Sequence, residues 1–247
     1  MESVDVVLLT KNSQKVLEKC LTSVYQNVPI NQLIVVDGYS TDKTLDILSR
    51  FNQKYHNVKI TYDKGTRATA REQGIQQVKT DWFMFIDSDV VVCKNWYQKA
   101  LKHLDKTAGG VWGIEVWSTI QSEAMLKMFL RVTRKIFDLR GGTHDTLIRT
   151  ELVRDIVIPK NLHVFEDAFI KDWIAKKGYK IVAAYNPYCI HYRPKDVWTL
   201  RGGLNLIVDA LRFGSLKLLF RLVFAYGFYT AYSVFQLFLS SIRPRKP

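Results

Sequence analysis

Cysteine is scarce in this chain, which has Cys20, Cys93 and Cys189 among 247 residues. They are too few and too scattered for a disulfide framework or a cysteine-based zinc site, so a reducing compartment is the simpler interpretation. The N-terminus also lacks a basic segment, because Glu2 and Asp5 precede the first apolar run. We therefore do not expect secretion through a signal peptide.

Acidic residues are outnumbered, since 36 lysines and arginines stand against 23 aspartates and glutamates, a net charge of +13. With 47% apolar and 24% charged residues, the chain is globular, which excludes disordered and collagen-like proteins. Residues 1–120 are nearly balanced, and the basic excess grows from Lys127 onward beside long apolar stretches. This pairing favours a membrane surface over nucleic acid as the partner.

The first half of the chain alternates between two hydrophobic periodicities. Short apolar runs predict strands at 4–9, 32–37, 58–62 and 82–86, and apolar residues at three- and four-residue spacing predict helices at 16–24, 45–51 and 69–78. Ser40-Thr41-Asp42 is expected to cap the second of these helices. The alternation predicts an α/β fold, a Rossmann-like, mostly parallel sheet with flanking helices.

The second half is less regular. We expect strands at 110–116, 141–148, 179–184 and 188–192, and helices at 122–139 and 166–177, the latter ended by Gly178.

The C-terminal part changes character, because residues 222–242 form a run of 21 residues without a charge. Such a run is long enough to span a bilayer. Basic residues flank it on both sides, however, so a span after a cytoplasmic domain would oppose the positive-inside tendency. We predict an α/β domain at 1–200 and a membrane-associated helical segment at 201–247, which either lies in the interface or spans once. Helices packed on the domain or on a partner chain are the alternative.

Two carboxylates, Asp87 and Asp89, follow the apolar strand 82–86. Ligands bind at the carboxyl ends of strands in open α/β sheets, and hard oxygen ligands suit Mn²⁺ or Mg²⁺. The pair is a candidate cation site, with an acidic turn as the alternative.

Two further segments follow predicted strands at the same edge. Asp37, before a turn and a helix, is suited to accept hydrogen bonds from a base or ribose. The basic segment 64–71 opens a helix, and helix N-termini and arginines both favour a diphosphate. The alternatives are a turn without a ligand and a solvated basic helix start.

Asp167 lies at the start of the helix predicted at 166–177, on the same face as Ile170 and Ile174. A carboxylate held at the entrance of a site is suited to deprotonate an acceptor hydroxyl, although an acidic first turn also complements the helix dipole. His191, at a strand end, is either a further cation ligand or a structural histidine.

In order and spacing, these segments resemble the family 2 inverting glycosyltransferases, which have the GT-A fold. The resemblance covers about residues 3–193 and rests on the following motifs: Val6 to Asn12, Val36 to Thr44, Lys64 to Gly74, the Asp87-Ser88-Asp89 motif and the Glu166-Asp167 pair. Gly38-Tyr39 departs from the family, which often has an aspartate or a smaller residue there, and the acceptor region matches poorly.

The resemblance implies a role for each site residue. Thr10, Asp37, Arg71 and Asp87 are expected to contact the nucleotide-sugar. Within this group, Asp37 is expected at the base, Arg71 near the diphosphate or base, and Asp87 at the ribose. The resemblance assigns a Mn²⁺ or Mg²⁺ ion to Asp89 and His191, and the general base to Asp167.

The expected activity is metal-dependent transfer of a sugar from a UDP- or GDP-sugar, with inversion, to a hydroxyl of a lipid-linked glycan. The expected place is the cytoplasmic face of a membrane, with peripheral or single-span attachment and no nucleic-acid partner. A polyprenyl-phosphate acceptor, a nucleotidyltransferase and a non-catalytic, membrane-attached nucleotide-sugar-binding protein are the alternatives.

Overall fold

The computed structural model describes residues 3–117, 124–127, 142–162 and 166–192, together with Val208 and Leu211. The chain divides into two compact units, one of residues 1–162 and 166–194, the other of residues 163–165 and 195–247. The predicted tail at 201–247 and most of the predicted helix 122–139 lie outside the described residues. Among the described helices, none combines the length and apolar character needed to cross a bilayer.

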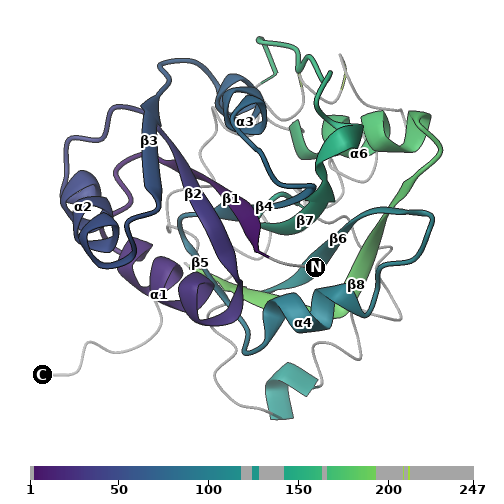
Figure 1. Ribbon diagram of the computed structural model, residues 1–247, viewed down its shortest axis with the longest axis horizontal. Helices are drawn as coiled ribbons and strands as arrows, with labels where there is room; N and C mark the ends of the chain where they lie inside the picture. The colour runs from purple at the N-terminus through teal and green to yellow at the C-terminus, as the bar shows by residue number, and fades with distance from the viewer. Residues whose placement is uncertain are drawn as a thin grey trace, which may run out of the picture. The chain divides into compact units, whose positions relative to one another are not determined.

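The first unit is built on one sheet of eight strands in the order β3-β2-β1-β4-β7-β6-β8-β5 (Figure 1). The strands are β1 (Val4–Thr10), β2 (Ile30–Asp37), β3 (Val58–Tyr62), β4 (Trp82–Asp87), β5 (Val90–Val92), β6 (Ala108–Trp117), β7 (Asp145–Arg149) and β8 (Lys180–His191). Strands β1 to β4 pair in parallel, β6 and β8 are also parallel, and β7 runs antiparallel to both of its neighbours. The α/β fold with a mostly parallel sheet is confirmed.

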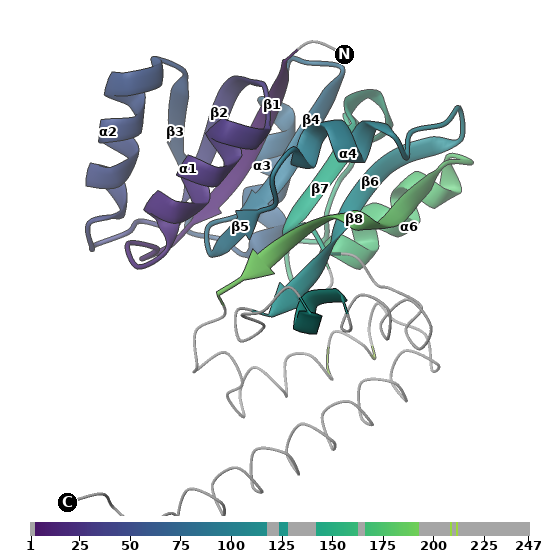
Figure 2. The ribbon, with the colours of Figure 1, turned by 90° about the horizontal axis from the view of Figure 1, so that it is seen from below.

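Helices cover both faces of this sheet. They are α1 (Leu17–Asn27), α2 (Thr44–Tyr55), α3 (Arg67–Gln76), α4 (Trp96–Leu101) and α6 (Glu166–Lys176), with a 3₁₀ turn, η1, at Thr150–Leu152. Helices α1 and α4 lie against one face, and α3 and α6 lie against the other (Figures 1 and 2). Helix α1 buries Leu17, Cys20, Leu21 and Val24, a stripe at three- and four-residue spacing that packs on the strands.

Several details differ from the sequence prediction, and the short elements β5 and α4 were not predicted. The strands expected at 179–184 and 188–192 form the single strand β8, whose register shifts so that Gly113 faces Ala184 and Ile114 faces Tyr188. The strand expected at 141–148 begins only at Asp145. Helix α2 follows Lys43, and Asp42, one residue earlier, accepts a hydrogen bond from the Thr44 N–H at 3.0 Å.

Candidate functional site

The carboxyl ends of three parallel strands meet at one edge of the sheet. Thr10 of β1 pairs with Asp37 of β2, and Leu9 pairs with Asp87 of β4. The structure therefore brings Thr10, Asp37 and Asp87 to neighbouring positions, as the sequence predicted. This is the edge at which ligands bind in open α/β sheets.

Asp37 is fully buried and organises the loop that follows β2. Its carboxylate accepts hydrogen bonds from the Thr10 hydroxyl at 2.6 Å, the Ser40 N–H at 2.7 Å and the Ser40 hydroxyl at 2.6 Å. The loop projects Tyr39, in a left-handed conformation (φ 59°), so that half of its surface is exposed. The Tyr39 ring lies 5.3 Å from the Tyr62 ring. Asp37 is thus already hydrogen-bonded within the protein, and an aromatic pair lies beside it.

The basic segment 64–71 divides into exposed and buried residues. Lys64 and Arg67 are exposed, and Lys64 Nζ lies 4.8 Å from the centre of the Tyr39 ring. Helix α3 begins with a capping box between Thr66 and Thr69. Arg71, one turn further along α3, is 2% exposed. Lys64 and Arg67 are therefore the members of the segment whose side chains face solvent.

Arg71 joins three elements of the site. Its Nη2 lies 3.0 Å from Asp87 Oδ1 of β4, and its Nε lies 3.3 Å from Glu166 Oε1 of α6. The guanidinium also packs over the Phe85 ring, 5.0 Å from its centre. Because arginine has donors in a fixed planar fork, one side chain holds both carboxylates at once.

The charge of Arg71 decides the ionisation of Asp87. Burial raises the pKa of Asp87, but the neighbouring Arg71 guanidinium, helped by His144 and His191, lowers it below its usual range. Asp87 is therefore an anion at neutral pH.

The structure also brings Asp89 and His191 together. Strands β5 and β8 pair so that Val90 faces His191, which places Asp89 Oδ1 3.1 Å from His191 Nε2. Glu115 Oε1 of β6 lies 3.4 Å from His191 Nδ1, so the ring stands between two carboxylates. Burial lowers the pKa of His191, but these carboxylates outweigh burial and raise the pKa to about 9.

This group fits a hard divalent cation. Neighbouring ligands of an octahedral ion with bonds of about 2.1 Å lie about 3 Å apart, so the spacing of 3.1 Å between Asp89 Oδ1 and His191 Nε2 is suitable. Carboxylate oxygen and imidazole nitrogen are ligands that such ions accept. Two carboxylates next to one imidazole leave net negative charge for a cation to balance, and binding of a cation at Nε2 would displace the proton that His191 retains at neutral pH.

Asp167, the predicted general base, begins α6 next to Glu166. Its Oδ1 accepts a hydrogen bond from the Ala168 N–H at 2.7 Å. Its Oδ2 lies 3.4 Å from the point that a Cβ would occupy on Gly142, and its charge contributes to the raised pKa of Arg71. Asp167 therefore lies close to both Arg71 and the loop that leads into β7.

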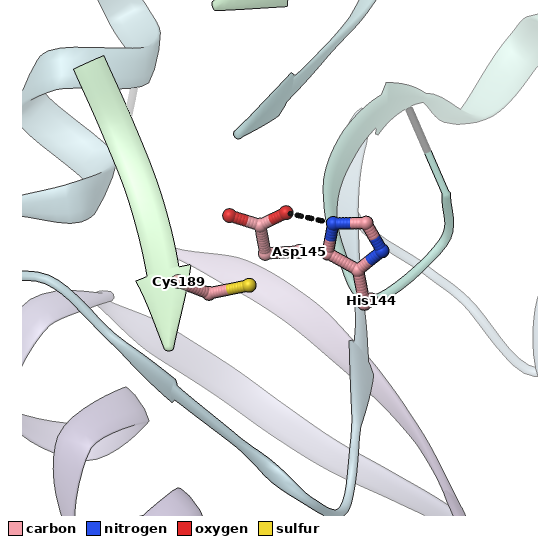
Figure 3. A group of neighbouring side chains, drawn as sticks. All are labelled: His144, Asp145 and Cys189. Atoms are coloured by element: carbon pink, nitrogen blue, oxygen red, sulfur yellow. Dashed lines mark ion pairs between the residues drawn. The ribbon is translucent and has the colours of Figure 1, made fainter. Parts of the chain in front are cut away.

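Sequence reasoning missed a buried polar group beside this site. His144, Asp145 and Cys189 place one ligand atom each within 4.8 Å of one another, and Asp145 lies between the other two (Figure 3). Asp145 Oδ2 accepts a hydrogen bond from Trp96 Nε1 at 2.8 Å, and Asp145 Oδ1 lies 3.2 Å from His144 Nε2. Burial raises the pKa of Asp145 to about 6, although His144 and Trp96 oppose the shift. Glu115 was also missed.

The close packing around Asp145 gives a stability prediction. A Cβ on Gly113 of β6 would lie 2.0 Å from Asp145 Oδ2, whose position is fixed by Trp96. We expect Gly113→Ala to lower the free energy of unfolding by about 1–3 kcal/mol, as overpacking does. In Gly38→Ala, the control, the nearest atom is the flexible Lys11 Cδ at 3.1 Å, and we expect little change. Urea denaturation measures both, and equal midpoints would contradict the prediction.

Known proteins resemble this chain in sequence and in fold. Residues 5–137 match the sequence profile of Glycosyl transferase family 2. The poly(ribitol-phosphate) beta-glucosyltransferase of Bacillus spizizenii is 32% identical over 240 residues, which cover 87% of this chain and 37% of that protein. The poly(ribitol-phosphate) beta-N-acetylglucosaminyltransferase TarS of Staphylococcus aureus is 27% identical over 180 residues, which cover 68% of this chain and 31% of TarS. The chain thus spans only about a third of the length of each relative, 37% of the first and 31% of the second.

Solved structures share the fold. The mannosyltransferase PcManGT from Pyrobaculum calidifontis, in complex with GDP-Man and Mn²⁺, superposes with a TM-score of 0.65 at 20% identity, over 87% of this chain and 68% of that one. S. aureus TarS 1–349, in complex with UDP-GlcNAc, gives a TM-score of 0.62 at 19% identity, over 90% and 72%. These similarities confirm the GT-A fold, and with the profile match over more than half of its length the chain belongs to glycosyl transferase family 2.

Proposed function

We propose that this glycosyltransferase moves a sugar from a nucleotide-sugar, with inversion, to a hydroxyl group of a lipid-linked glycan at the cytoplasmic face of a membrane. The observation that carries the proposal is the convergence of three groups at one sheet edge. These are the strand-end residues Thr10, Asp37 and Asp87, the Asp89–His191 pair, and Asp167. The bound nucleotide-sugars of PcManGT and TarS support a donor of this class.

Each of these residues has one role in a single nucleophilic displacement at the anomeric carbon. Asp167 accepts the proton of the acceptor hydroxyl as its oxygen attacks the anomeric carbon, and the bond from that carbon to the diphosphate oxygen breaks. Asp89 and His191 would hold a Mn²⁺ or Mg²⁺ ion, which would stabilise the charge on the departing nucleoside diphosphate. The exposed Lys64 and Arg67 add positive charge at the same edge.

The acceptor and its location rest on separate arguments. A phosphate acceptor is already an anion and needs little help from a base, so a carboxylate at Asp167 favours a hydroxyl acceptor. The names of both curated relatives specify poly(ribitol-phosphate), a polymer of a polyhydroxy alcohol. Membrane attachment rests on the sequence, since residues 222–242 are uncharged and flanked by basic residues.

The decisive experiment measures release of nucleoside diphosphate from UDP-glucose, UDP-GlcNAc and GDP-mannose, each with a membrane lipid extract or with poly(ribitol-phosphate). We expect release with one donor in Mn²⁺ or Mg²⁺, its loss in EDTA and its return when the ion is restored. Full activity in EDTA would contradict the metal assignment. Nucleotide binding without release under any condition would favour the non-catalytic alternative, and no binding would refute the donor site.

The cation ligands can be tested separately. We expect Asp89→Ala to raise the concentration of Mn²⁺ needed for half-maximal activity at least about tenfold, because loss of a carboxylate at a metal site weakens affinity by that order. Asp46→Ala, which removes an exposed carboxylate from α2, is the control. An unchanged requirement in Asp89→Ala, measured by titration of the ion, would show that Asp89 is not a ligand.

A further inference from the structure

Two exposed tyrosines lie together where strands β2 and β3 end. Tyr39 follows β2, and Tyr62, the last residue of β3, pairs with Asp37, the last residue of β2 (Figure 1). Among the phenylalanine, tyrosine and tryptophan side chains whose exposure the structure describes, only these two are exposed, Tyr39 by 50% and Tyr62 by 47%. Their ring centres lie 5.3 Å apart. Aromatic rings that gather at the surface in this way offer a contact surface for a flat ligand.

The backbone holds Tyr39 in a conformation that favours glycine. Its φ is 59°, and this left-handed region is unfavourable for a residue that has a Cβ. Hydrogen bonds on both sides fix the conformation. The Gly38 N–H donates to the Thr10 carbonyl at 2.8 Å, and the Ser40 N–H donates to the Asp37 carboxylate at 2.7 Å. The fold therefore keeps an exposed tyrosine where glycine would cost less, and backbone strain of this kind clusters at ligand sites.

The polar residues at the neighbouring strand ends are buried, so the rings form the contact surface here. Thr10 is 4% exposed and Asp37 is fully buried. Lys64, which is exposed, places its Nζ 4.8 Å from the centre of the Tyr39 ring. An ammonium group on a flexible stem lies over a ring face that solvent reaches, and it can leave that face when a flat ligand arrives.

The rings lie on the side of the site away from the predicted general base. Strand β3 is three strands from β4, about 14 Å at the usual strand spacing. Arg71 links Asp87, at the end of β4, to Glu166 of α6, the helix that carries Asp167. A nucleotide-sugar has its base and its sugar at opposite ends. A donor whose diphosphate lies at the proposed cation site and whose sugar faces Asp167 therefore extends its base towards β3.

We propose that Tyr39 and Tyr62 bind the nucleobase of the donor by stacking, and that the base takes the face of the Tyr39 ring over which Lys64 lies. The displaced ammonium group of Lys64 then contacts the diphosphate. This assignment rests on the proposed function, because it requires a nucleotide-sugar at this edge of the sheet. Asp37 is then a positioning residue, because its hydrogen bonds with Ser40 hold the loop that projects Tyr39.

The decisive variant is Tyr39→Gly, because glycine adopts the same backbone conformation without strain and removes the ring. Calorimetric titration in Mn²⁺ compares UDP, GDP and inorganic pyrophosphate, which lacks a base. We expect the Kd of the nucleoside diphosphate that the wild-type enzyme binds to rise about 5- to 100-fold, the contribution of stacking one base on an aromatic ring, while the Kd of pyrophosphate stays unchanged. Tyr39→Phe keeps the ring and should bind as the wild type does.

Stability measurements show whether a loss of binding is a folding defect. Because Tyr39→Gly relieves strain, its urea midpoint should equal or exceed that of the wild type. His56→Gly is the matched control, since His56 is exposed, has a φ of 56° and precedes β3 at the other end of that strand. We expect it to leave the binding of all three probes unchanged. A fall in the affinity for pyrophosphate in Tyr39→Gly as large as that for UDP or GDP would show a general defect of the site and would overturn the proposal.

Lys64→Ala separates the base from the phosphates. We expect it to weaken pyrophosphate and the nucleoside diphosphate alike, by about two- to fivefold, as loss of an exposed ion pair does. A loss confined to UDP or GDP would mean that the lysine, and not the ring, contacts the base, and would overturn the assignment.

The remaining outcomes separate this inference from the proposed function. If Tyr39→Gly binds UDP and GDP as tightly as the wild type does, the rings do not bind the base and the inference fails. If the KM for the acceptor rises instead, the rings bind sugars of the acceptor, and the proposed function stands without the inference. If the wild-type enzyme binds neither UDP nor GDP, the donor site of the proposed function fails as well.

Discussion

Replacement of Asp167 by asparagine is expected to lower kcat by about 10²- to 10⁴-fold, the range that general base catalysis contributes, without weakening donor binding. The amide keeps the size of the side chain but cannot accept the proton of the acceptor hydroxyl. Sugar transfer under saturating donor measures kcat, and titration with the nucleoside diphosphate measures binding. Asp172→Asn, which changes an exposed carboxylate on the same helix, is the matched control and should retain full activity.

The same variant distinguishes between acceptor classes. If Asp167→Asn transfers sugar at nearly the wild-type rate, the acceptor does not require a base, and a polyprenyl phosphate becomes the better assignment. Glu166 is poorly placed to substitute for Asp167, because it is 5% exposed and lies 3.3 Å from Arg71 Nε.

The parallel half of the fold was predictable because its strands are apolar runs. Strand β4 is apolar from Trp82 to Ile86, and β1 is nearly so, which periodicity detects directly. Strand β5 has only three residues, and α4 has six and begins after Asn95 in a left-handed conformation. Such short elements carry too few positions for a period to be visible. They form because partners distant in sequence, β8 above all, provide the contacts.

The same reasoning explains which site residues were found. Asp37, Asp87 and Asp89 each follow a strand, so their place at the sheet edge follows from the topology. His144 and Glu115 become site residues only because β7 and β6 pair with strands that are far away in the sequence. One signal was present for His144, namely that the polar run Thr143 to Thr146 precedes the apolar Leu147-Ile148 in a segment that was expected to be an ordinary strand.

The prediction with the largest effect on stability concerns Arg71. We expect Arg71→Met to lower the free energy of unfolding by about 3–5 kcal/mol, the cost of leaving a buried charge without its partner. Most of this cost should come from Glu166, whose side chain is 7% exposed, because the Asp87 side chain is 31% exposed and water screens it. Arg50→Met is the control, since among the described residues Arg50 pairs with Glu18 alone and both side chains are more than half exposed. Urea denaturation of both variants measures the difference.

A second change isolates the cause. Arg71→Met combined with Glu166→Gln removes the uncompensated buried charge, so the double variant should recover a large part of the stability lost by Arg71→Met alone. Recovery of stability without recovery of transfer would mean that Arg71 also positions Asp87 for catalysis through their ion pair. If the double variant is no more stable than Arg71→Met, the loss comes from packing of the guanidinium over Phe85, and the explanation by an uncompensated buried charge is wrong.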